Sequence, residues 1–358
     1  MREISRIGID ISRTVFQLHA ARSDGSVAWR KRVYRSDFVV TMQNIPPCEV
    51  AMEACSGSHY WGRELEKMGH KVKLIPPQYV KPFVKRNKND AADAEGIVEA
   101  ASRPTMRWIP VKTVEQQELG HLHSARERMV KHRTALVNEI KSFMHEHGIL
   151  LTCSAKKLYG EYLAKLEVHG ERLSNVFKRL MSRLFEQLRN TESVISEYEK
   201  ELETLHKNNE LSVRLTSIPG VGLMTATAVI AAVGNASHYR SGRDFAASLG
   251  VVPRQHSSGQ VQRLKGLSKR GNVYIRKTMI QGGHSVVRVA PKAKGRRGEW
   301  LRALVQRSGK CKAAVAVANR NARIMWKLIV SGERYDSNYM NSILKEDSNA
   351  SIEVNVVC

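Results

Sequence analysis

Two long segments with a helical repeat of apolar residues constrain the fold of this chain more than any other feature. They span roughly residues 113–147 and 171–207, and dense charge covers their remaining faces. Their apolar positions recur every three or four residues, which is typical of a coiled coil or a helical hairpin. These positions are Leu122, Ala125, Met129, Leu136, Ile140 and Phe143, then Leu173, Val176, Leu180, Leu184, Leu188, Ile195, Tyr198, Leu202 and Leu205. The spacing fits a partner helix in the same chain and one in a second copy equally well.

The segment before these helices has the pattern of an α/β domain. Short apolar or alternating runs at residues 6–12, 14–21, 26–34, 48–54 and 70–77 predict strands. Amphipathic stretches at 58–69 and 90–102 predict helices between and after them. Three strands in succession, followed by strands that alternate with helices, favour a mixed sheet.

The last third of the chain has the pattern of a mainly helical domain. Helices are predicted at 217–234, 241–249, 271–288, 297–308 and 311–331, and the stretch 256–272 between them is predicted to be a basic loop. The predicted organisation is therefore a catalytic α/β domain at 1–108, a long-helix region at 109–210, a basic helical domain at 211–334 and a polar tail at 335–358.

The charge of the chain is large and unevenly distributed. The net charge is +24, and residues 214–334 contain 23 Lys and Arg against 3 acids, which places +20 in that third. So large an excess indicates a polyanionic partner such as nucleic acid. A protein that is merely basic, with no such partner, is the alternative.

Targeting and cysteine patterns indicate a reduced, cytoplasmic protein. No apolar run approaches the ~20 residues of a membrane span, and the N-terminus lacks the apolar core of a signal peptide. The five cysteines show no CxxC spacing, which predicts reduced free thiols without a zinc site. We therefore expect no membrane partner.

Four acidic residues form the first candidate site. Asp10 interrupts an apolar strand, where a charge is costly unless it is paired or binds a metal, and Glu53 ends another. Asp90 and Asp93 are three residues apart in a predicted helix and so share one face. Together the four carboxylates offer the oxygen ligands that one or two Mg²⁺ ions need for phosphodiester chemistry. Asp90 alone could equally be a helix N-cap.

Two further stretches suit phosphate groups. In "SIPGVG", Gly220 and Gly222 precede a predicted helix, whose N-terminal N–H groups can bind a phosphate. An ordinary tight turn explains the same residues equally well. The second stretch, 254–277, has enough cations to neutralise several phosphates, although a solvated basic face is the alternative. These cations are Arg254, Arg263, Lys265, Lys269, Arg270, Arg276 and Lys277.

The motifs in their order resemble one family. "GIDIS", "MEACSGSHYWGREL" and "KNDAADAEGI" are similar to the DEDD catalytic motifs of insertion-sequence transposases with a RuvC-like N-terminal domain of RNase H fold. The resemblance continues through "SIPGVG", "FAASLGVVPRQHSSG" and "GLSKRGNVYIRK", and covers roughly residues 4–330. The family is the insertion-sequence 110 type, and the long helices are most similar to its 1111 subgroup.

This resemblance implies a mechanism and partners. Family members have a nucleophilic serine in a second, C-terminal transposase domain, and their element encodes a structured bridge RNA that pairs with donor and target DNA. Because the family's serine directly precedes a glycine, the resemblance favours Ser258, before Gly259, over Ser257 as the nucleophile that forms a phosphoserine link. No acid lies in 256–272 to act as a base, so we expect the metal site, from the same or a neighbouring subunit, to complete a composite centre.

Three functions remain open on the sequence alone. An RNA-guided DNA recombinase uses both the acids and the serine, and it joins two duplexes, which predicts a dimer or a tetramer. A metal-dependent, junction-resolving nuclease needs the acids but forms no covalent intermediate. A non-catalytic RNA-binding protein has no use for a charge in an apolar strand. The paired serines and the extended basic domain favour the first.

Overall fold

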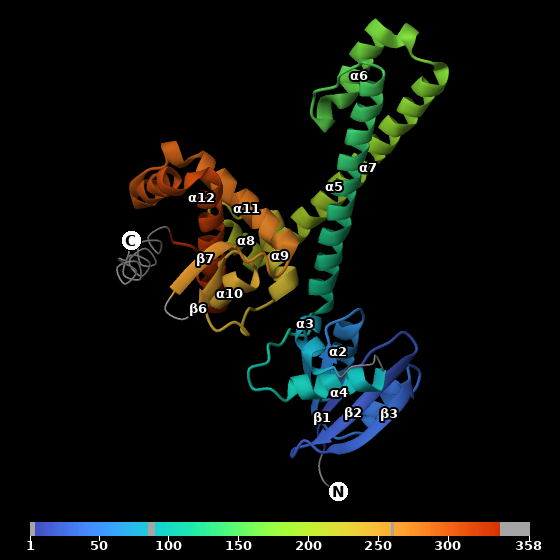
Figure 1. Ribbon diagram of the computed structural model, residues 1–358, viewed down its shortest axis with the longest axis vertical. Helices are drawn as coiled ribbons and strands as arrows, with labels where there is room; N and C mark the ends of the chain where they lie inside the picture. Colours follow the sequence, from blue (N-terminus) through green and yellow to red (C-terminus); the bar gives the residue numbers. More distant parts are fainter. Residues whose placement is uncertain (1–3, 85–89, 259–260, 337–358) are drawn as a thin grey trace. The chain divides into compact units, whose positions relative to one another are not determined.

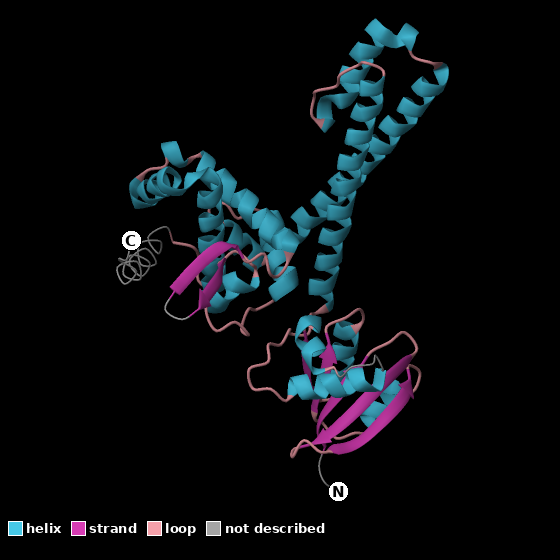
Figure 2. Cartoon of the chain, in the orientation of Figure 1, coloured by secondary structure: helices cyan, strands magenta, loops and turns pink. Residues whose placement is uncertain are grey.

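The computed structural model describes residues 4–84, 90–258 and 261–336, and the side chains of Asp90 and Gln262 lie outside that description. The chain divides into two compact units, Met1–Gln117 and Glu118–Cys358. The first combines a sheet with helices, and the second is mainly helical with a two-stranded ribbon (Figure 2). The finer division into four segments stays a prediction.

The first unit is built on a mixed five-stranded sheet. The strand order is β3-β2-β1-β4-β5, in which β1, β2 and β3 are antiparallel and β4 and β5 run parallel to β1. The strands are β1 (Ile4–Asp10), β2 (Val15–Arg22), β3 (Val27–Tyr34), β4 (Glu49–Glu53) and β5 (Lys71–Ile75). All five predicted strands and the mixed sheet are therefore confirmed.

Helices cover the two faces of this sheet, as the strand alternation requires. Ile7, Ile9 and Phe16 pack with α1 (Phe38–Gln43) and α2 (Ser58–Lys67) in one core. Ala51 and Ile75 form a second core with α3 (Pro77–Val80) and α4 (Asp90–Ala101). Figure 1 shows α4 lying over β1 and β2. Gly8 of β1 lets α4 approach closely. A Cβ atom on Gly8 would lie 2.6 Å from the carbonyl oxygen of Ala94.

The long helices of the second unit form a hairpin within one chain. A shared core joins the end of α5 (Val114–Glu146), α6 (Ala155–His169) and the first half of α7 (Asn175–Lys207). Helix α6 was not predicted from the sequence, and its central Gly160 lowers its intrinsic helix propensity. Packing of Leu158 and Tyr162 in the hairpin core stabilises this helix instead.

The C-terminal part contains α8 (Glu210–Thr216), α9 (Leu223–Val233), α10 (Gly242–Ser248), α11 (Val273–Arg288) and α12 (Gly295–Ser331). Gly309, with φ 77° and ψ 162°, interrupts α12 and so yields the two predicted helical stretches. Apolar residues of α9, α10, α11 and α12 share one core, in which Phe245 and Met325 are fully buried.

One prediction for this part of the chain is wrong. The stretch 256–272, which we expected to be a loop, belongs largely to an antiparallel hairpin of β6 (Pro253–Ser258) and β7 (Val261–Leu267). The described Ser, Gln and Arg residues of the two strands are all exposed, so no apolar alternation marks the strands. Backbone pairing, which composition does not reveal, sets this structure.

Two other expectations concern the cysteines and the membrane. Cys48, Cys55, Cys153 and Cys311 are free, as predicted, and Cys358 lies outside the described residues. None of the helices in the described ranges has the length and apolar content needed to cross a bilayer.

Candidate nucleic-acid interface and acidic site

Three of the predicted acidic residues converge where β1 and β4 end, on the side of the sheet formed by the carboxyl-terminal ends of these strands; we call this side the acidic edge. Asp10 is the last residue of β1 and Glu53 is the last of β4, and the pairing of Ile9 with Met52 makes these strand ends neighbours. Both acids have the same strand parity as Gly8 and Ala51, so they face the side of the sheet that α4 covers. Asp93 lies on α4, next to the Ala94 carbonyl that approaches Gly8.

The electrostatics of this edge agree with its geometry. Partial burial, and then the charge of Asp93, raise the pKa of Glu53 above its usual value. The pKa of the Cys55 thiol is also raised, by partial burial and then by the charges of Glu53 and Asp10. Glu53 and Asp93 are therefore close enough for their charges to repel, and Glu53 and Asp10 both act on the Cys55 thiol.

The position of Asp10 differs in one detail from the expectation. Asp10 ends β1 and is half-buried, whereas we expected it in the middle of a buried strand. At a strand end the carboxylate reaches the sheet edge without the full cost of burial. The side chain of Asp90 lies outside the described residues, although its backbone begins α4.

The donor chemistry at this edge fits a hard divalent cation. Carboxylate oxygens are the ligands that Mg²⁺ prefers in proteins. Among the described side chains, which do not include Asp90, no three acidic, His or Cys groups already lie within joint binding distance of a metal. Asp10, Glu53 and Asp93 are the described residues that would hold the ion.

The β6–β7 ribbon presents the two candidate serines on opposite faces. Ser258 pairs with Val261, and His256 pairs with Arg263 directly across the ribbon. Because strand side chains alternate, Ser258, His256 and Arg263 share one face. Ser257 projects from the other, where its hydroxyl accepts a hydrogen bond from the Gln255 amide at 3.1 Å. Gly259, next to Ser258, lies outside the described residues.

The base of this ribbon is tightly fixed. Gly250 and Gly271 both have positive φ and lie very close to the neighbouring segment of the same chain. A Cβ atom on Gly250 would be 1.9 Å from the carbonyl oxygen of Arg270, and one on Gly271 would be 1.9 Å from that of Ser248. Arg276 is buried and its guanidinium donates to the carbonyl of Arg270 at 2.9 Å. The structure therefore gives Arg276 a structural role in place of the phosphate contact that we expected.

The remaining predicted phosphate ligands on and near the ribbon are exposed. They are Arg254, Arg263 and Lys265 on the strands, and Lys269 and Arg270 just after β7. Lys269 has a left-handed backbone, with φ 55°, in the turn toward α11. This set gives the ribbon and its base a positive surface that suits a phosphate backbone.

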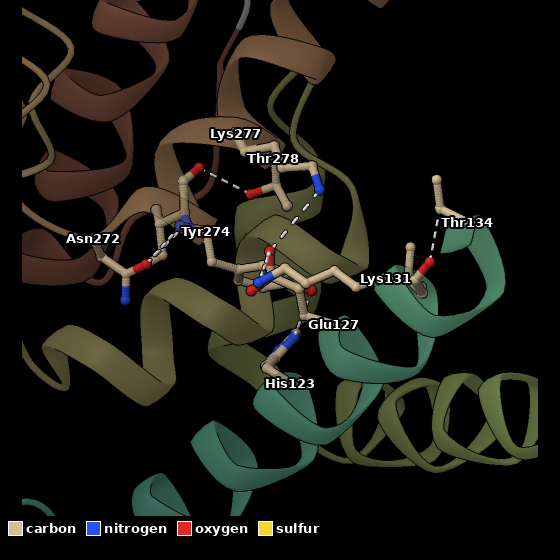
Figure 3. Close-up of polar contacts among 10 residues, drawn as sticks. His123, Glu127, Lys131, Thr134, Asn272, Tyr274, Lys277 and Thr278 are labelled. Atoms are coloured by element: carbon tan, nitrogen blue, oxygen red, sulfur yellow. Dashed lines mark hydrogen bonds and ion pairs between the residues drawn. The ribbon is translucent and has the colours of Figure 1, made fainter. Parts of the chain in front are cut away.

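Lys277 has a carboxylate neighbour within its own unit. Figure 3 shows its ammonium facing Glu127 of α5, and the two charged groups are 3.9 Å apart. Lys131 lies 4.0 Å from the same carboxylate. Lys277 is exposed and Glu127 is half-buried, and an ion pair this near the surface contributes only ~0–1 kcal/mol. The phosphate contact expected of Lys277 stays a prediction.

The "SIPGVG" turn leaves the start of α9 open. Gly222 is the N-cap, offers no side chain to the first N–H groups and has open space where a Cβ would stand. Gly220 has φ +92° and packs on α11, where a Cβ on Gly282 would lie 1.8 Å from its carbonyl oxygen. The turn therefore has a fixed backbone and no side chain over the start of α9, which agrees with the expected phosphate site, and that site stays a prediction.

Comparisons with known proteins match this arrangement in two blocks. Residues 7–149 match the DEDD_Tnp_IS110 transposase model, and residues 212–297 match the model described as Transposase IS116/IS110/IS902 family. The chain is 42% identical over 335 residues to the transposase for insertion sequence element IS1111A of Coxiella burnetii, covering 94% of this chain and 92% of that protein. The chain belongs to the IS110 family of insertion-sequence transposases.

Two other transposases are similar to this chain over nearly its whole length. A probable family 20 transposase of Pseudomonas aeruginosa is 42% identical, over 91% of this chain and 97% of its own length. The transposase for insertion sequence element IS1328 of Yersinia enterocolitica is 37% identical, over 93% of this chain and 98% of its own length. In this transposase the first matched block contains the acidic edge, and the second contains the "SIPGVG" turn and the ribbon.

One residue of the ribbon was overlooked in the sequence. No acid lies between residues 256 and 272, from which we concluded that a local base is absent. His256, two residues before Ser258 on the same strand, is a titratable group on the serine's own face. Recognising 253–258 as a strand would have placed the two side chains together.

Proposed function

We propose that this transposase cuts and rejoins DNA through the Ser258 hydroxyl, which forms a covalent phosphoserine link to a DNA strand. The observation that carries the proposal is the position of Ser258, exposed at the tip end of β6 on a ribbon with a fixed base and a cationic surface. The cations would hold the scissile phosphate and offset charge that develops on its oxygens. A covalent link conserves the bond energy that rejoining requires.

We further propose that Asp10, Glu53, Asp90 and Asp93 bind one or two Mg²⁺ ions in an RNase H-like domain. The strand order and directions of the sheet, together with the carboxylates at its edge, support this assignment. Bound Mg²⁺ supplies charge that stabilises a phosphoryl transition state. We propose that this site and Ser258, from the same or a neighbouring subunit, act on one phosphate.

The proposed partners are donor DNA, target DNA and a structured bridge RNA. The net charge of +20 in residues 214–334 supports a long nucleic-acid footprint on the second unit. Sequencing of the nucleic acid that copurifies with the transposase tests the RNA partner. One structured RNA with segments complementary to donor and target sites is expected, whereas random cellular RNA would contradict guidance.

A denaturing gel of protein–DNA adducts tests the serine. We expect wild type and Ser257→Ala to form a covalent adduct with a labelled DNA substrate, and Ser258→Ala to form none. Adducts that persist in Ser258→Ala but disappear in Ser257→Ala would move the assignment by one residue. Strand cleavage without adducts in the wild type would instead favour a junction-resolving nuclease.

Acid-to-amide variants test the metal site. We expect Asp10→Asn and Asp93→Asn to abolish strand cleavage while RNA binding, measured by gel shift, stays largely intact. Asp37→Asn, an exposed acid outside the sheet edge, is the matched control and should cleave normally. Cleavage that continues in EDTA would refute the metal requirement.

A further inference from the structure

The register of the β6–β7 ribbon separates two chemically different faces. One face presents Ser258 and His256 from β6, with Arg263 opposite His256. The other presents Ser257 and Gln255, which are already joined by the 3.1 Å hydrogen bond. A neutral amide can position a hydroxyl, but it cannot take up a proton near neutral pH. Of the two serines, Ser258 therefore has the ionisable neighbour on its own face.

The separation of His256 and Ser258 suits proton transfer. Side chains two residues apart on a strand are spaced by about 6.6 Å along it and point the same way. An imidazole can cover this distance to a hydroxyl directly or through one water molecule. Both residues are exposed on the described face, so neither an approaching phosphate nor such a water is blocked by the chain.

We propose that His256 is the general base that activates Ser258, and that Arg263 holds the scissile phosphate beside them. This inference rests on the proposed function of Ser258 as the nucleophile. Arg263 lies directly across the ribbon from His256, and Arg254 is two residues earlier on β6.

The proposed step is balanced within these groups and the DNA. The Ser258 hydroxyl gives its proton to an imidazole nitrogen of His256, and its oxygen forms a bond to phosphorus. The bond between phosphorus and one sugar oxygen breaks, and that sugar oxygen takes the proton back from the imidazolium. One phosphodiester and one serine hydroxyl become a phosphoserine diester and one sugar hydroxyl, with no change in oxidation state.

Rates of adduct formation on a labelled DNA substrate test this assignment. General bases typically contribute 10²–10⁴-fold, so we expect His256→Ala to form the adduct at least about 100-fold more slowly than wild type. Added imidazole should restore part of that rate, because the ribbon face is open to solvent. Gln255→Ala is the matched control on the opposite face and should retain the wild-type rate.

A pH profile distinguishes a base from a residue that only shapes the ribbon. The wild-type rate should fall on the acid side as the imidazole takes up a proton, and that fall should be absent in His256→Ala. A His256→Ala rate equal to wild type, or a slow rate with an unchanged acid limb and no rescue by imidazole, would overturn the role of His256. Ser258→Ala, run in parallel, tests the proposed function separately, since adducts in that variant would refute the nucleophile and not merely its base.

Discussion

At the scale of single residues, a buried polar network fixes the start of α5 within the second unit. The His123 ring lies 3.1 Å from the Tyr274 hydroxyl (Figure 3). It also lies 2.9 Å from the Thr227 hydroxyl, which itself donates to the carbonyl of Leu223. These contacts join α5 to the first turn of α9 and to the first turn of α11. The elements that carry both candidate phosphate sites therefore share one buried histidine.

The titration of His123 predicts a loss of stability in acid. Burial, and then the charge of Arg126, lower the pKa of His123 to about 4, whereas an unfolded chain binds that proton near pH 6.5. Stability should therefore fall as the pH drops from about 6.5 toward 4, by about 2 kcal/mol at pH 5. Denaturant unfolding at pH 7 and pH 5 measures this loss. His123→Gln should lack it, while exposed His121→Gln should retain it; equal losses in all three proteins would contradict the prediction.

The close packing at Gly282 predicts a severe effect of one methyl group. Its Cβ would stand 1.8 Å from the carbonyl oxygen of Gly220, so Gly282→Ala must displace α11 or the "SIPGVG" turn. We expect a loss of about 1–3 kcal/mol in unfolding free energy and weaker binding of nucleic acid. Gly266→Ala, on β7 with open space around it, is the control and should unfold like wild type. Similar behaviour of the two variants would show that the contact is not tight.

At the scale of elements, the helical hairpin buries some apolar residues of the α7 repeat and leaves others exposed. Leu184 belongs to the core shared by α5, α6 and α7 and is 7% exposed. Val176 and Leu180 on the same helix are 68% and 41% exposed. The repeat therefore includes one stripe that closes the hairpin and a few positions left for another partner.

This distinction predicts different outcomes for charged substitutions on α7. If assembly uses the outer face, Val176→Glu with Leu180→Glu should reduce the oligomer while helix content stays unchanged. Leu184→Glu should lower the melting temperature of the hairpin, because it buries a charge. Light scattering with RNA and DNA present measures the assembly, and circular dichroism measures the helices. A wild type that remains monomeric, or a double variant with the wild-type mass, would contradict an assembly through this face.

At the scale of the whole molecule, the charge is concentrated in the second unit, which predicts where salt acts. Replacing Lys269 and Arg270 by Ala should lower the slope of log K against log salt by about two, one for each phosphate that no longer has its cation. Lys156→Ala with Lys157→Ala, on exposed positions of α6, removes the same charge from the hairpin. This control should leave the slope nearly unchanged. Equal slopes for the ribbon variant and wild type would place the nucleic acid elsewhere.

Most of the elements and the acidic edge could be predicted from the sequence, but the ribbon could not. Strands with alternating or continuous apolar residues bury a face, so Ile7, Ile9 and their neighbours indicate the sheet, and a carboxylate that ends such a strand is conspicuous. The ribbon buries neither face and gives no such signal. The burial of Arg276 could not be predicted either, because its guanidinium contacts the carbonyl of Leu249, 27 residues earlier, as well as that of nearby Arg270.

Because the base of the ribbon is fixed, the number of residues between it and Ser258 decides which face of the ribbon carries the serine. The close backbone contacts of Gly250 and Gly271 fix the base of the ribbon, and this fixed base sets the direction in which each side chain along the strands points. Each residue between base and tip reverses the face that follows it. Within the regularly paired part of β6, from Gln255 to Ser258, a single insertion or deletion would turn Ser258 to the opposite face while leaving composition and charge almost unchanged. Inserting or deleting an odd number of residues should therefore abolish attack by Ser258, because its side chain would face away from His256 and Arg263. Inserting or deleting an even number should keep Ser258 on its present face.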